Sequence, residues 1–320
     1  MSMVTLEDIL EAQRIIAGRL HRTPLLSAHA LGTMAQPPVN LFLKAEMLQK
    51  TGAFKVRGAL NKLAALSPEQ KQRGLITVSA GNHAQAVAWS AAAEHVPATV
   101  VMAETAVRSK VNATRGYGAE VVLFGTSMSG IFDHAHQLEN ERGLLFIPPF
   151  DDPRIVAGQG TVGLEILEDL PDPDLVIIPC GGGGLCSGVA TVIKSKRPQT
   201  RVVIVEPEGA PTMRRSLDAG KPVALERIET IADGLTAPFT SELTLSLTQR
   251  YVDDAVLVSD EEIAQAMGLI LERCKLLAEP AAAASVAALL SGKVHAAEGA
   301  KVVAILSGGN VDRERLKQLL

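Results

Sequence analysis

The sequence predicts an α/β protein with a largely parallel sheet. Strand-like and helix-like segments alternate almost throughout the chain. The longest apolar runs, such as residues 175–180 and 302–306, have the length of a buried strand. The chain has 320 residues, and since a domain averages about 150 residues, this length suggests about two domains.

The first half of the chain shows the clearest alternation. The Thr5 hydroxyl can accept a hydrogen bond from the following turn and so cap a helix over residues 6–19. The segments that follow are predicted, in order, as strand 39–46, helix 54–66, strand 75–80, helix 83–95, strand 98–104, helix 108–118, strand 120–125 and helix 128–142.

The second half continues the pattern with longer gaps. Its predicted elements are a helix that ends near residue 170, strand 175–180, a helix from the glycine run 181–184 to about residue 196, strand 201–208, helix 261–277 and strand 301–307. Residues 74–150 hold short strand–helix units that can form a layer of their own. We therefore predict a small domain over 74–150 and a large domain over 1–73 and 151–320.

Composition excludes several classes of protein. The 31 basic and 35 acidic residues leave a net charge of −4, with no basic stripe for a nucleic acid. No apolar run approaches the ~20 residues of a membrane helix, and the amino terminus does not resemble a signal peptide. Three cysteines without a CxxC pair predict neither a disulfide framework nor a zinc site. We expect a cytoplasmic protein that binds neither nucleic acid nor membrane.

A glycine run, Gly181 to Gly184, joins a predicted strand to a predicted helix. Glycines leave their backbone N–H groups uncovered and can adopt positive φ, so such a loop can wrap a phosphate. The dipole of the following helix favours the same anion. A plain left-handed turn needs only one or two glycines, so four favour a phosphate site.

A dinucleotide fingerprint is the competing interpretation of this loop. Gly182 and Gly184 match its first two glycines, and Glu206 ends the next strand. Ser187 stands where the third glycine belongs. The loop also lies late in the chain, whereas such fingerprints usually belong to the first strand–helix unit of a nucleotide domain.

Lys55 stands at the start of a predicted helix, which is the wrong end for a lysine that only complements the helix dipole. The apolar Phe54 and the nearby Arg57 can depress the pKa of its amine, as an amine nucleophile requires. Taken alone, an exposed structural lysine remains the better interpretation.

A second polar loop, Ser79-Ala80-Gly81-Asn82-His83, lies between a predicted strand and helix. It offers hydroxyl, amide and backbone N–H donors to a carboxylate. His83 alone is better interpreted as a capping or packed histidine than as a catalytic base.

Taken together, these loops and the terminal Ser307-Gly308-Gly309-Asn310 resemble the pyridoxal-phosphate enzymes of the tryptophan-synthase-β type, and within them the threonine/serine dehydratase and serine racemase branch. The resemblance covers nearly the whole chain. Further matching segments are Thr23-Pro24-Leu25, Ala157 to Thr161, Ile231 to Gly234, Glu279-Pro280 and Val311-Asp312.

The resemblance implies a fold type II architecture of two open, twisted, largely parallel sheets with helices on both faces, divided between a large cofactor-binding and a small substrate-binding domain. It implies pyridoxal 5'-phosphate as cofactor, held by Phe54, Lys55, Asn82, Gly181, Gly182, Gly183, Gly184, Leu185, Gly234, Glu279 and Ser307. It implies catalytic or substrate contacts from Lys55, Ser79, Asn82 and His83.

By this resemblance, Lys55 forms the Schiff base with the cofactor, and its amine, once displaced, acts as general base at the substrate Cα. Asn82 would bond the 3-hydroxyl of the cofactor and Ser307 its pyridine nitrogen. A neutral hydroxyl at that nitrogen favours loss of a β-substituent over transamination. Loss of a β-hydroxyl then leads to a 2-oxo acid and ammonia.

Two positions depart from the family pattern. Racemases of this branch carry a serine at the position of Ala80, so racemisation is disfavoured and a one-base dehydratase is favoured. The branch often binds a divalent cation, for which Glu206 and Ala210 match, but Thr212 replaces a second acid. Hard cations need several anionic oxygens, so we assign no metal site.

The sequence therefore predicts an ammonia-lyase that acts on a β-hydroxy-α-amino acid and forms a homo-oligomer, either a dimer or a tetramer. The segment 126–132 contains no arginine, which favours threonine, serine or an aryl-serine over 3-hydroxyaspartate. The alternatives are a serine racemase, a hydroxyaspartate dehydratase, a β-replacement enzyme or a non-catalytic cofactor- or nucleotide-binding protein. The reactive Lys55 amine and its surrounding loops argue against the non-catalytic alternative, because a binding protein needs no reactive amine.

Overall fold

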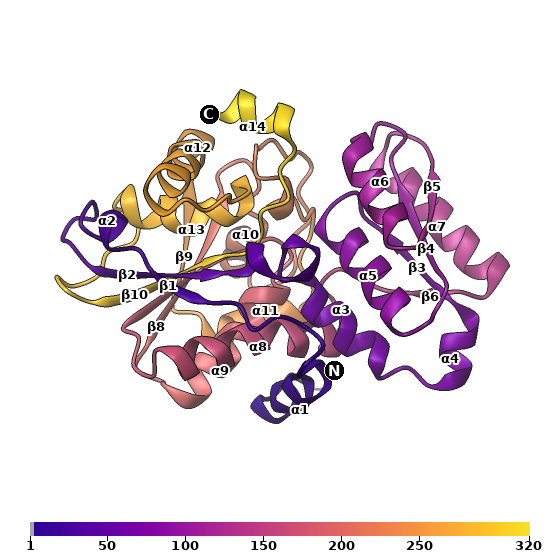
Figure 1. Cartoon of the computed structure of the whole chain (residues 1–320), viewed down its shortest axis with the longest axis horizontal. Helices are drawn as coiled ribbons and strands as arrows, with labels where there is room; N and C mark the ends of the chain where they lie inside the picture. The colour runs from indigo at the N-terminus through magenta and orange to yellow at the C-terminus, as the bar shows by residue number, and fades with distance from the viewer. Residues whose placement is uncertain (1–2) are drawn as a thin grey trace.

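A six-stranded and a four-stranded sheet lie side by side in the computed structural model, which describes residues 3–320 (Figure 1). In the large sheet, β1 is antiparallel to β2 and all other neighbours are parallel. Its order is β1 (Leu25–Ser27), β2 (Asn40–Ala45), β10 (Lys301–Leu306), β7 (Leu175–Pro179), β8 (Arg201–Pro207) and β9 (Asp254–Val258).

Helices cover both faces of the large sheet because alternate residues of its strands point to opposite sides. Leu175 and Ile177 of β7 pack with α12 (Asp260–Leu269) and α13 (Pro280–Leu290). Their neighbours Val176 and Ile178 pack with α8 (Pro153–Asp169) and α9 (Gly184–Lys196). The strand is buried on both faces, as its unbroken apolar sequence predicts.

The small sheet is wholly parallel and also lies between helices. Its order is β5 (Glu120–Leu123), β4 (Ala98–Met102), β3 (Leu75–Val78) and β6 (Leu145–Phe146). The helices on one face are α3 (Lys55–Ala64), α5 (Asn82–Ala93) and α6 (Arg108–Gly116), and α7 (Met128–Arg142) covers the other. The predicted α/β fold with two largely parallel sheets is confirmed, while the limits 74–150 of the small domain stay a prediction.

The remaining elements are short or lie at the periphery. They are α1 (Leu6–Ile16), α2 (His29–Gly32), η1 (Glu46–Leu48), η2 (Lys50–Gly52), α4 (Pro68–Arg73), α10 (Thr212–Ala219), η3 (Asp233–Leu235), α11 (Glu242–Tyr251), η4 (Ile270–Cys274) and α14 (Arg313–Leu319). As predicted, the Thr5 hydroxyl caps α1, where it accepts from the N–H of Asp8.

The helix predicted over 261–277 changes type partway and ends three residues early. The α-helix α12 ends at Leu269, one turn of π-helix follows, and Lys275 takes a left-handed backbone with φ 60°. This break redirects the chain, and the following segment brings Glu279 to the cleft between the sheets. The helix predicted over 6–19 also ends early, at Ile16.

Helix α13 was missed because it has no polar face. Its sequence PAAAASVAALL is apolar all round, so no periodic stripe announces a helix. Ten of its eleven residues are buried, in keeping with its central place against the large sheet. Within residues 3–320, no helix is long and apolar enough to cross a membrane.

Candidate active site

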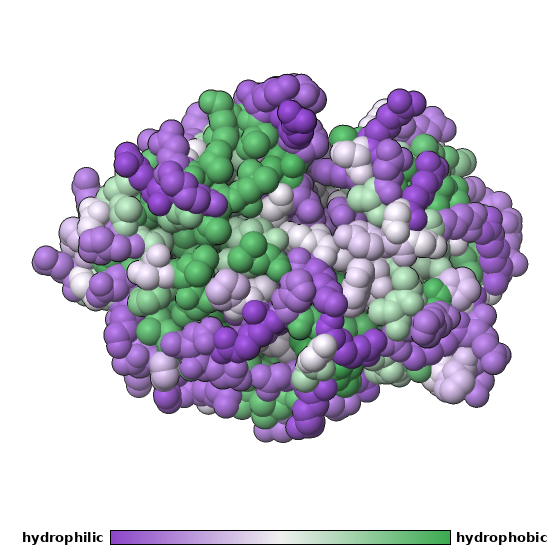
Figure 2. Space-filling model, in the orientation of Figure 1, coloured by the Kyte–Doolittle hydropathy of each residue, from purple (hydrophilic) through white to green (hydrophobic). Residues whose placement is uncertain are grey.

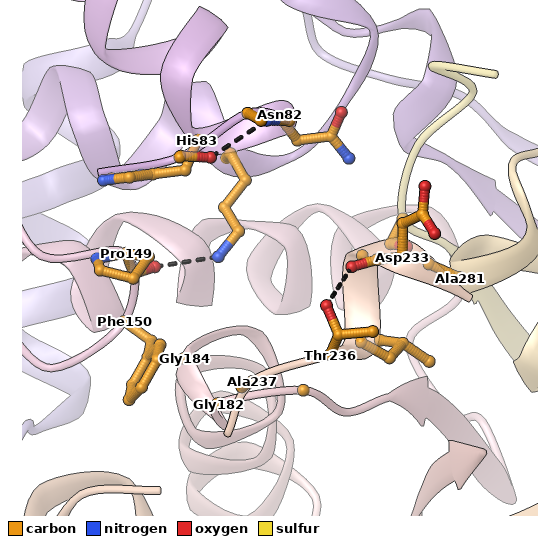
Figure 3. A pocket seen from close by; sticks show the side chains of 18 of the residues that line it. Asn82, His83, Pro149, Phe150, Gly182, Gly184, Asp233, Thr236, Ala237 and Ala281 are labelled. Atoms are coloured by element: carbon orange, nitrogen blue, oxygen red, sulfur yellow. Dashed lines mark hydrogen bonds between the residues drawn. The ribbon is translucent and has the colours of Figure 1, made fainter. Parts of the chain in front are cut away.

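A cleft of about 930 Å³ opens between the two sheets and collects the carboxyl ends of strands from both. Open α/β sheets bind their ligands at this edge. Figure 2 shows an indentation of the surface between α14 and α6, the helices that contribute Arg315 and Lys110 to the cleft lining. Figure 3 shows Asn82 and His83 across the cleft from Gly182 and Gly184.

The glycine loop occupies the floor of the cleft, between the end of β7 and the start of α9. Gly183 has φ 93°, a backbone that favours glycine, and it precedes α9, whose first residues Gly184 and Leu185 line the cleft with N–H groups that have no partner within the helix. A Cβ at Gly182 would overlap the ring of Phe150. This loop therefore requires glycine, and it presents N–H donors where an anion can bind.

Lys55 is the first residue of α3 and lines the cleft. Its Nζ donates to the carbonyl oxygen of Pro149 at 2.9 Å, the dashed line beside Pro149 in Figure 3. Burial lowers the pKa of the Lys55 amine to about 8, and nearby Glu279 acts weakly in the opposite direction. A fraction of this amine is neutral near physiological pH, as a nucleophile or base requires.

The expectation that Arg57 helps to depress this pKa is wrong. The Arg57 side chain is fully buried and binds the carboxylates of Glu46 and Glu165, away from the cleft lining. Burial is the cause of the low pKa of Lys55.

Phe54 links the start of α3 to the end of β10. Its N–H donates to the carbonyl oxygen of Ser307 at 3.1 Å, and its ring centroid lies 5.3 Å from Lys55 Nζ. Ser307 is buried and lines the cleft. It directly follows β10, the last strand in the sequence. These contacts hold the lysine and the serine in one part of the site.

Asn82 connects the small sheet to the large one. Its Nδ2 donates to Glu279 Oε1 at 2.7 Å, and its Oδ1 accepts from Asn310 Nδ2 at 2.8 Å. Burial raises the pKa of the Glu279 carboxyl to about 7, against the effect of the hydrogen bond from Asn82. Both states of this carboxyl are therefore populated near neutral pH.

The polar loop before α5 divides into two parts. Ser79 Oγ accepts from the Gly81 N–H at 3.1 Å. Helix α5 begins after Gly81 without a side-chain cap, so no capping side chain occupies its first N–H groups. His83 is buried, and its Nε2 donates to the Ile147 carbonyl oxygen at 3.1 Å. Burial, and then the charge of Lys55, lower the pKa of His83 to about 3, so the imidazole is neutral.

The cleft brings together all of the predicted site residues. They are Phe54, Lys55, Ser79, Asn82, His83, Gly181, Gly182, Gly183, Gly184, Leu185, Gly234, Glu279 and Ser307. Their roles stay predictions.

Four aromatic and charged residues of the lining, Phe150, Phe239, Lys110 and Asp233, were not predicted as site residues. Phe150 follows β6, and Phe239 lies in the segment before α11. Lys110 of α6 and Asp233 of η3 approach across the cleft, with Lys110 Nζ 3.4 Å from Asp233 Oδ2. The one available signal was the scarcity of aromatic residues in the chain, which makes each of them informative.

Glu206 accepts hydrogen bonds from the first turn of helix α10. Its two carboxylate oxygens accept from the N–H groups of Met213 and Arg214, each at 2.7 Å, and Thr212 Oγ donates to the Ala237 carbonyl oxygen. Burial raises the pKa of Glu206 to about 7, against these backbone hydrogen bonds.

In the part of the chain that the structure describes, no three His, Cys, Asp or Glu side chains are grouped so as to hold a metal ion.

The family model of the pyridoxal-phosphate dependent enzymes matches residues 16–308. The chain belongs to this family. The predicted family and the fold type that it implies are thus confirmed. The family's cofactor is anionic, and the site fits it: side chains at Gly182 and Gly183 would collide with Phe150, Met213 and Thr244, so the loop keeps an uncovered backbone, and the Lys55 amine lies in the same cleft.

Several members of this family are similar over nearly the whole chain. The L-threonine ammonia-lyase of Thermotoga maritima is 45% identical over 318 residues, which cover 99% of this chain and 78% of that protein. The catabolic L-threonine dehydratase TdcB of Escherichia coli K12 is 42% identical over 317 residues, which cover 99% and 96%. The solved structure of maize serine racemase has a TM-score of 0.94 at 40% identity, covering 99% of this chain and 97% of that one.

Proposed function

We propose that this chain is a pyridoxal-phosphate-dependent ammonia-lyase that converts a β-hydroxy-α-amino acid, such as threonine, serine or an aryl-serine, to a 2-oxo acid and ammonia. The observation that carries the proposal is the Lys55 amine, with a pKa lowered to about 8, in one cleft with two anion-binding helix starts. The names of the dehydratase relatives support the reaction class.

The cofactor phosphate would lie on the N–H groups of Gly181 to Leu185 at the start of α9. Phe54, Asn82, Gly234 and Ser307 would surround its ring, with Glu279 beyond Asn82. When bound, pyridoxal 5'-phosphate supplies the electron sink for negative charge at the substrate Cα. The protein supplies position and proton transfer.

Lys55 acts as the base that removes the Cα proton. With a pKa of about 8, its amine is in part neutral at physiological pH, and the Pro149 carbonyl oxygen 2.9 Å away orients it by accepting its N–H. In the proposed reaction, the proton from Cα passes to Nζ, and the electron pair left at Cα forms a Cα–Cβ double bond as the Cβ–O bond breaks and the hydroxyl leaves, with a proton, as water. The resulting enamine takes up a proton at Cβ to become an imine, and water hydrolyses this imine to the 2-oxo acid and ammonia.

The loop from Ser79 to His83 would bind the substrate carboxylate. The Ser79 hydroxyl and the N–H groups at the start of α5 are its donors. The neutral His83 contributes by packing, because its Nε2–H is held by the Ile147 carbonyl oxygen.

Ser307 and Ala80 direct the outcome of the reaction. A serine hydroxyl cannot stabilise a protonated pyridine as a carboxylate would, which favours prompt loss of the β-hydroxyl. Ala80 lines the cleft but has no proton to give to the second face of Cα, which favours elimination over racemisation.

We also propose a small domain over residues 74–150, a homo-oligomer and a cytoplasmic location.

The test is product formation by the purified holoenzyme. We expect threonine to yield 2-oxobutyrate and ammonia in equal amounts, and serine to yield pyruvate and ammonia. Exchange of the Cα proton without a 2-oxo acid would contradict the lyase, and so would replacement of the β-hydroxyl by an added thiol. If a protein that carries its cofactor forms no 2-oxo acid, exchanges no Cα proton and replaces no β-hydroxyl, the non-catalytic alternative is favoured.

A further inference from the structure

Five of the seven phenylalanines of the chain line the one cleft described above. They are Phe54, Phe132, Phe146, Phe150 and Phe239. Only 3% of all residues are aromatic, so this concentration is unusual for the chain. Phe54 lies beside Lys55 at the reacting centre, and the other four form two walls farther out.

The first wall belongs to the small sheet and its helix α7. Met128, Phe132 and His136 are spaced by four residues, so they form one stripe along the helix, and all three line the cleft. The Phe146 ring lies 6.3 Å from the ring of Phe132 and 5.2 Å from that of His136. These rings present edges and faces to a ligand in the cleft.

The second wall lies against the glycine loop that follows β7 of the large sheet. The rings of Phe150 and Phe239 meet edge to face, with centroids 5.7 Å apart. Phe150 also packs on the glycine loop, because Cβ atoms at Gly182 and Gly184 would touch it. Phe239 remains 43% exposed, and Met128 of the first wall 55% exposed. Large apolar side chains held open at the mouth of a cleft are typical of a ligand site.

The cleft has to hold the cofactor as well as the substrate. Its volume of about 930 Å³ lies near the top of the range of roughly 300–1,000 Å³ that holds a drug-sized ligand. Two cations, Lys110 and Arg315, also line it, and Lys110 is paired with Asp233. The aromatic rings form the apolar part of the lining that a β-substituent can contact.

We propose that Phe132 of α7, together with Phe146 and Phe239, determines specificity for a β-hydroxy-α-amino acid with an aryl substituent at Cβ, a 3-arylserine, in preference to threonine. The inference rests on the proposed lyase function and names its substrate class. The aryl ring would lie between the two walls, where offset and edge-on contacts between rings are favourable. Threonine fills only the part of the cleft next to Lys55.

The experiment compares kcat/KM of the holoenzyme for 3-phenylserine, threonine and 3-hydroxyaspartate. We expect 3-phenylserine to exceed threonine by at least about tenfold, the lower end of what one apolar group contributes in a hydrophobic pocket. Phe132→Leu should lower kcat/KM for 3-phenylserine by about tenfold and lower that for threonine less. Phe124→Leu is the matched control, since Phe124 is 40% exposed, stacks on His134 and is absent from the cleft lining.

The outcomes separate the inference from the proposed function. If kcat/KM for threonine equals or exceeds that for 3-phenylserine, the inference is overturned and the lyase function stands. A higher kcat/KM for 3-hydroxyaspartate than for 3-phenylserine also overturns the inference, and would mean that Lys110 or Arg315 binds the β-carboxylate. A loaded enzyme that makes no 2-oxo acid from any of the three overturns the lyase itself. An equal loss for both substrates in Phe132→Leu assigns Phe132 to the fold, against the inference.

Discussion

Arg57 donates two hydrogen bonds to Glu46 in the interior of the protein, Nε to Oε2 and Nη2 to Oε1, each 2.8 Å long. Both side chains are fully buried. Arg57 also reaches Glu165 of α8, which in turn binds Lys44 of β2 at 2.6 Å. Two positive and two negative side chains thus tie the first turn of α3, and with it Lys55, to the large sheet.

Removing one carboxylate from this cluster should destabilise the protein. Glu46→Ala leaves the Arg57 guanidinium buried with too little negative charge, and breaking a buried pair in this way costs about 3–5 kcal/mol. Denaturant unfolding measures the loss. Glu229→Ala, which removes the exposed partner of Arg227, is the control and should change stability little. A Glu46→Ala protein as stable as this control would contradict the prediction.

Helix geometry excludes the predicted effect of Arg57 on the amine of Lys55. Residues two apart on an α-helix do not face each other, so Lys55 can point into the cleft while Arg57 points into the core. That the two side chains diverge could be predicted from this rule. The partners of Arg57 could not, because Glu46 and Glu165 come from distant elements whose packing no local pattern encodes.

Most of the strands and the glycine loop were predictable because buried strands and glycine runs leave local signals, but β1, β6 and β9 were not predicted. The assembly of the site was predictable only through the family resemblance, since Lys55, Glu279 and Ser307 lie far apart in the chain and meet through the topology of the sheets. Phe150 and Phe239 carry no local signal. Their pairing depends on how two loops lie against each other.

Lys55→Ala should abolish turnover and the covalent attachment of the cofactor. Reduction of the wild-type holoenzyme with borohydride, followed by digestion and mass spectrometry, should find the reduced adduct on Lys55. Lys50→Ala is the control, because Lys50 lies over the Trp89 ring and outside the cleft lining. An adduct on any other lysine would overturn the assignment of Lys55.

Gly183→Ala should weaken cofactor binding. A Cβ there would lie 2.7 Å from Met213 Cε and 2.8 Å from Thr244 Cβ, and φ 93° is strained for alanine by about 1–3 kcal/mol. The loop must move to relieve both, and its N–H donors move with it. Gly143→Ala is the matched control, with φ 65° but open space around the new Cβ.

Visible absorbance during cofactor titration measures the affinity in these two variants. We expect at least a tenfold weaker Kd for Gly183→Ala, equivalent to about 1.4 kcal/mol, and an unchanged Kd for Gly143→Ala. Equal affinities in both variants would show that the cofactor phosphate binds elsewhere.

His83 should make the apoprotein sensitive to acid. Its folded pKa of about 3 lies below the ordinary 6.5, so the unfolded chain takes up a proton first as the pH falls. The stability that this group contributes is therefore complete above pH 6.5 and is lost progressively from there toward pH 3. From pH 7 to pH 5 the loss is about 2 kcal/mol.

His83→Gln isolates this contribution, because a glutamine amide can still donate to the Ile147 carbonyl oxygen and does not titrate. Urea unfolding at pH 7 and at pH 5 should show a smaller fall in stability for the variant than for the wild type, by about 2 kcal/mol. The same fall in both proteins would mean that His83 is charged in the folded state.

Ala80 provides the test that separates elimination from racemisation. Lys55 is the one amine placed at the reacting centre by the proposal, and Ala80, which lines the same cleft, can neither give nor take a proton. Wild-type enzyme supplied with L-serine should therefore release pyruvate and ammonia with little D-serine. Ala80→Ser introduces a hydroxyl at the position where the racemases of the family carry serine, and we expect the ratio of D-serine to pyruvate to rise. Chiral chromatography combined with a pyruvate assay measures this ratio. Racemisation as fast as elimination in the wild-type enzyme would mean that a group other than residue 80 serves the second face of Cα.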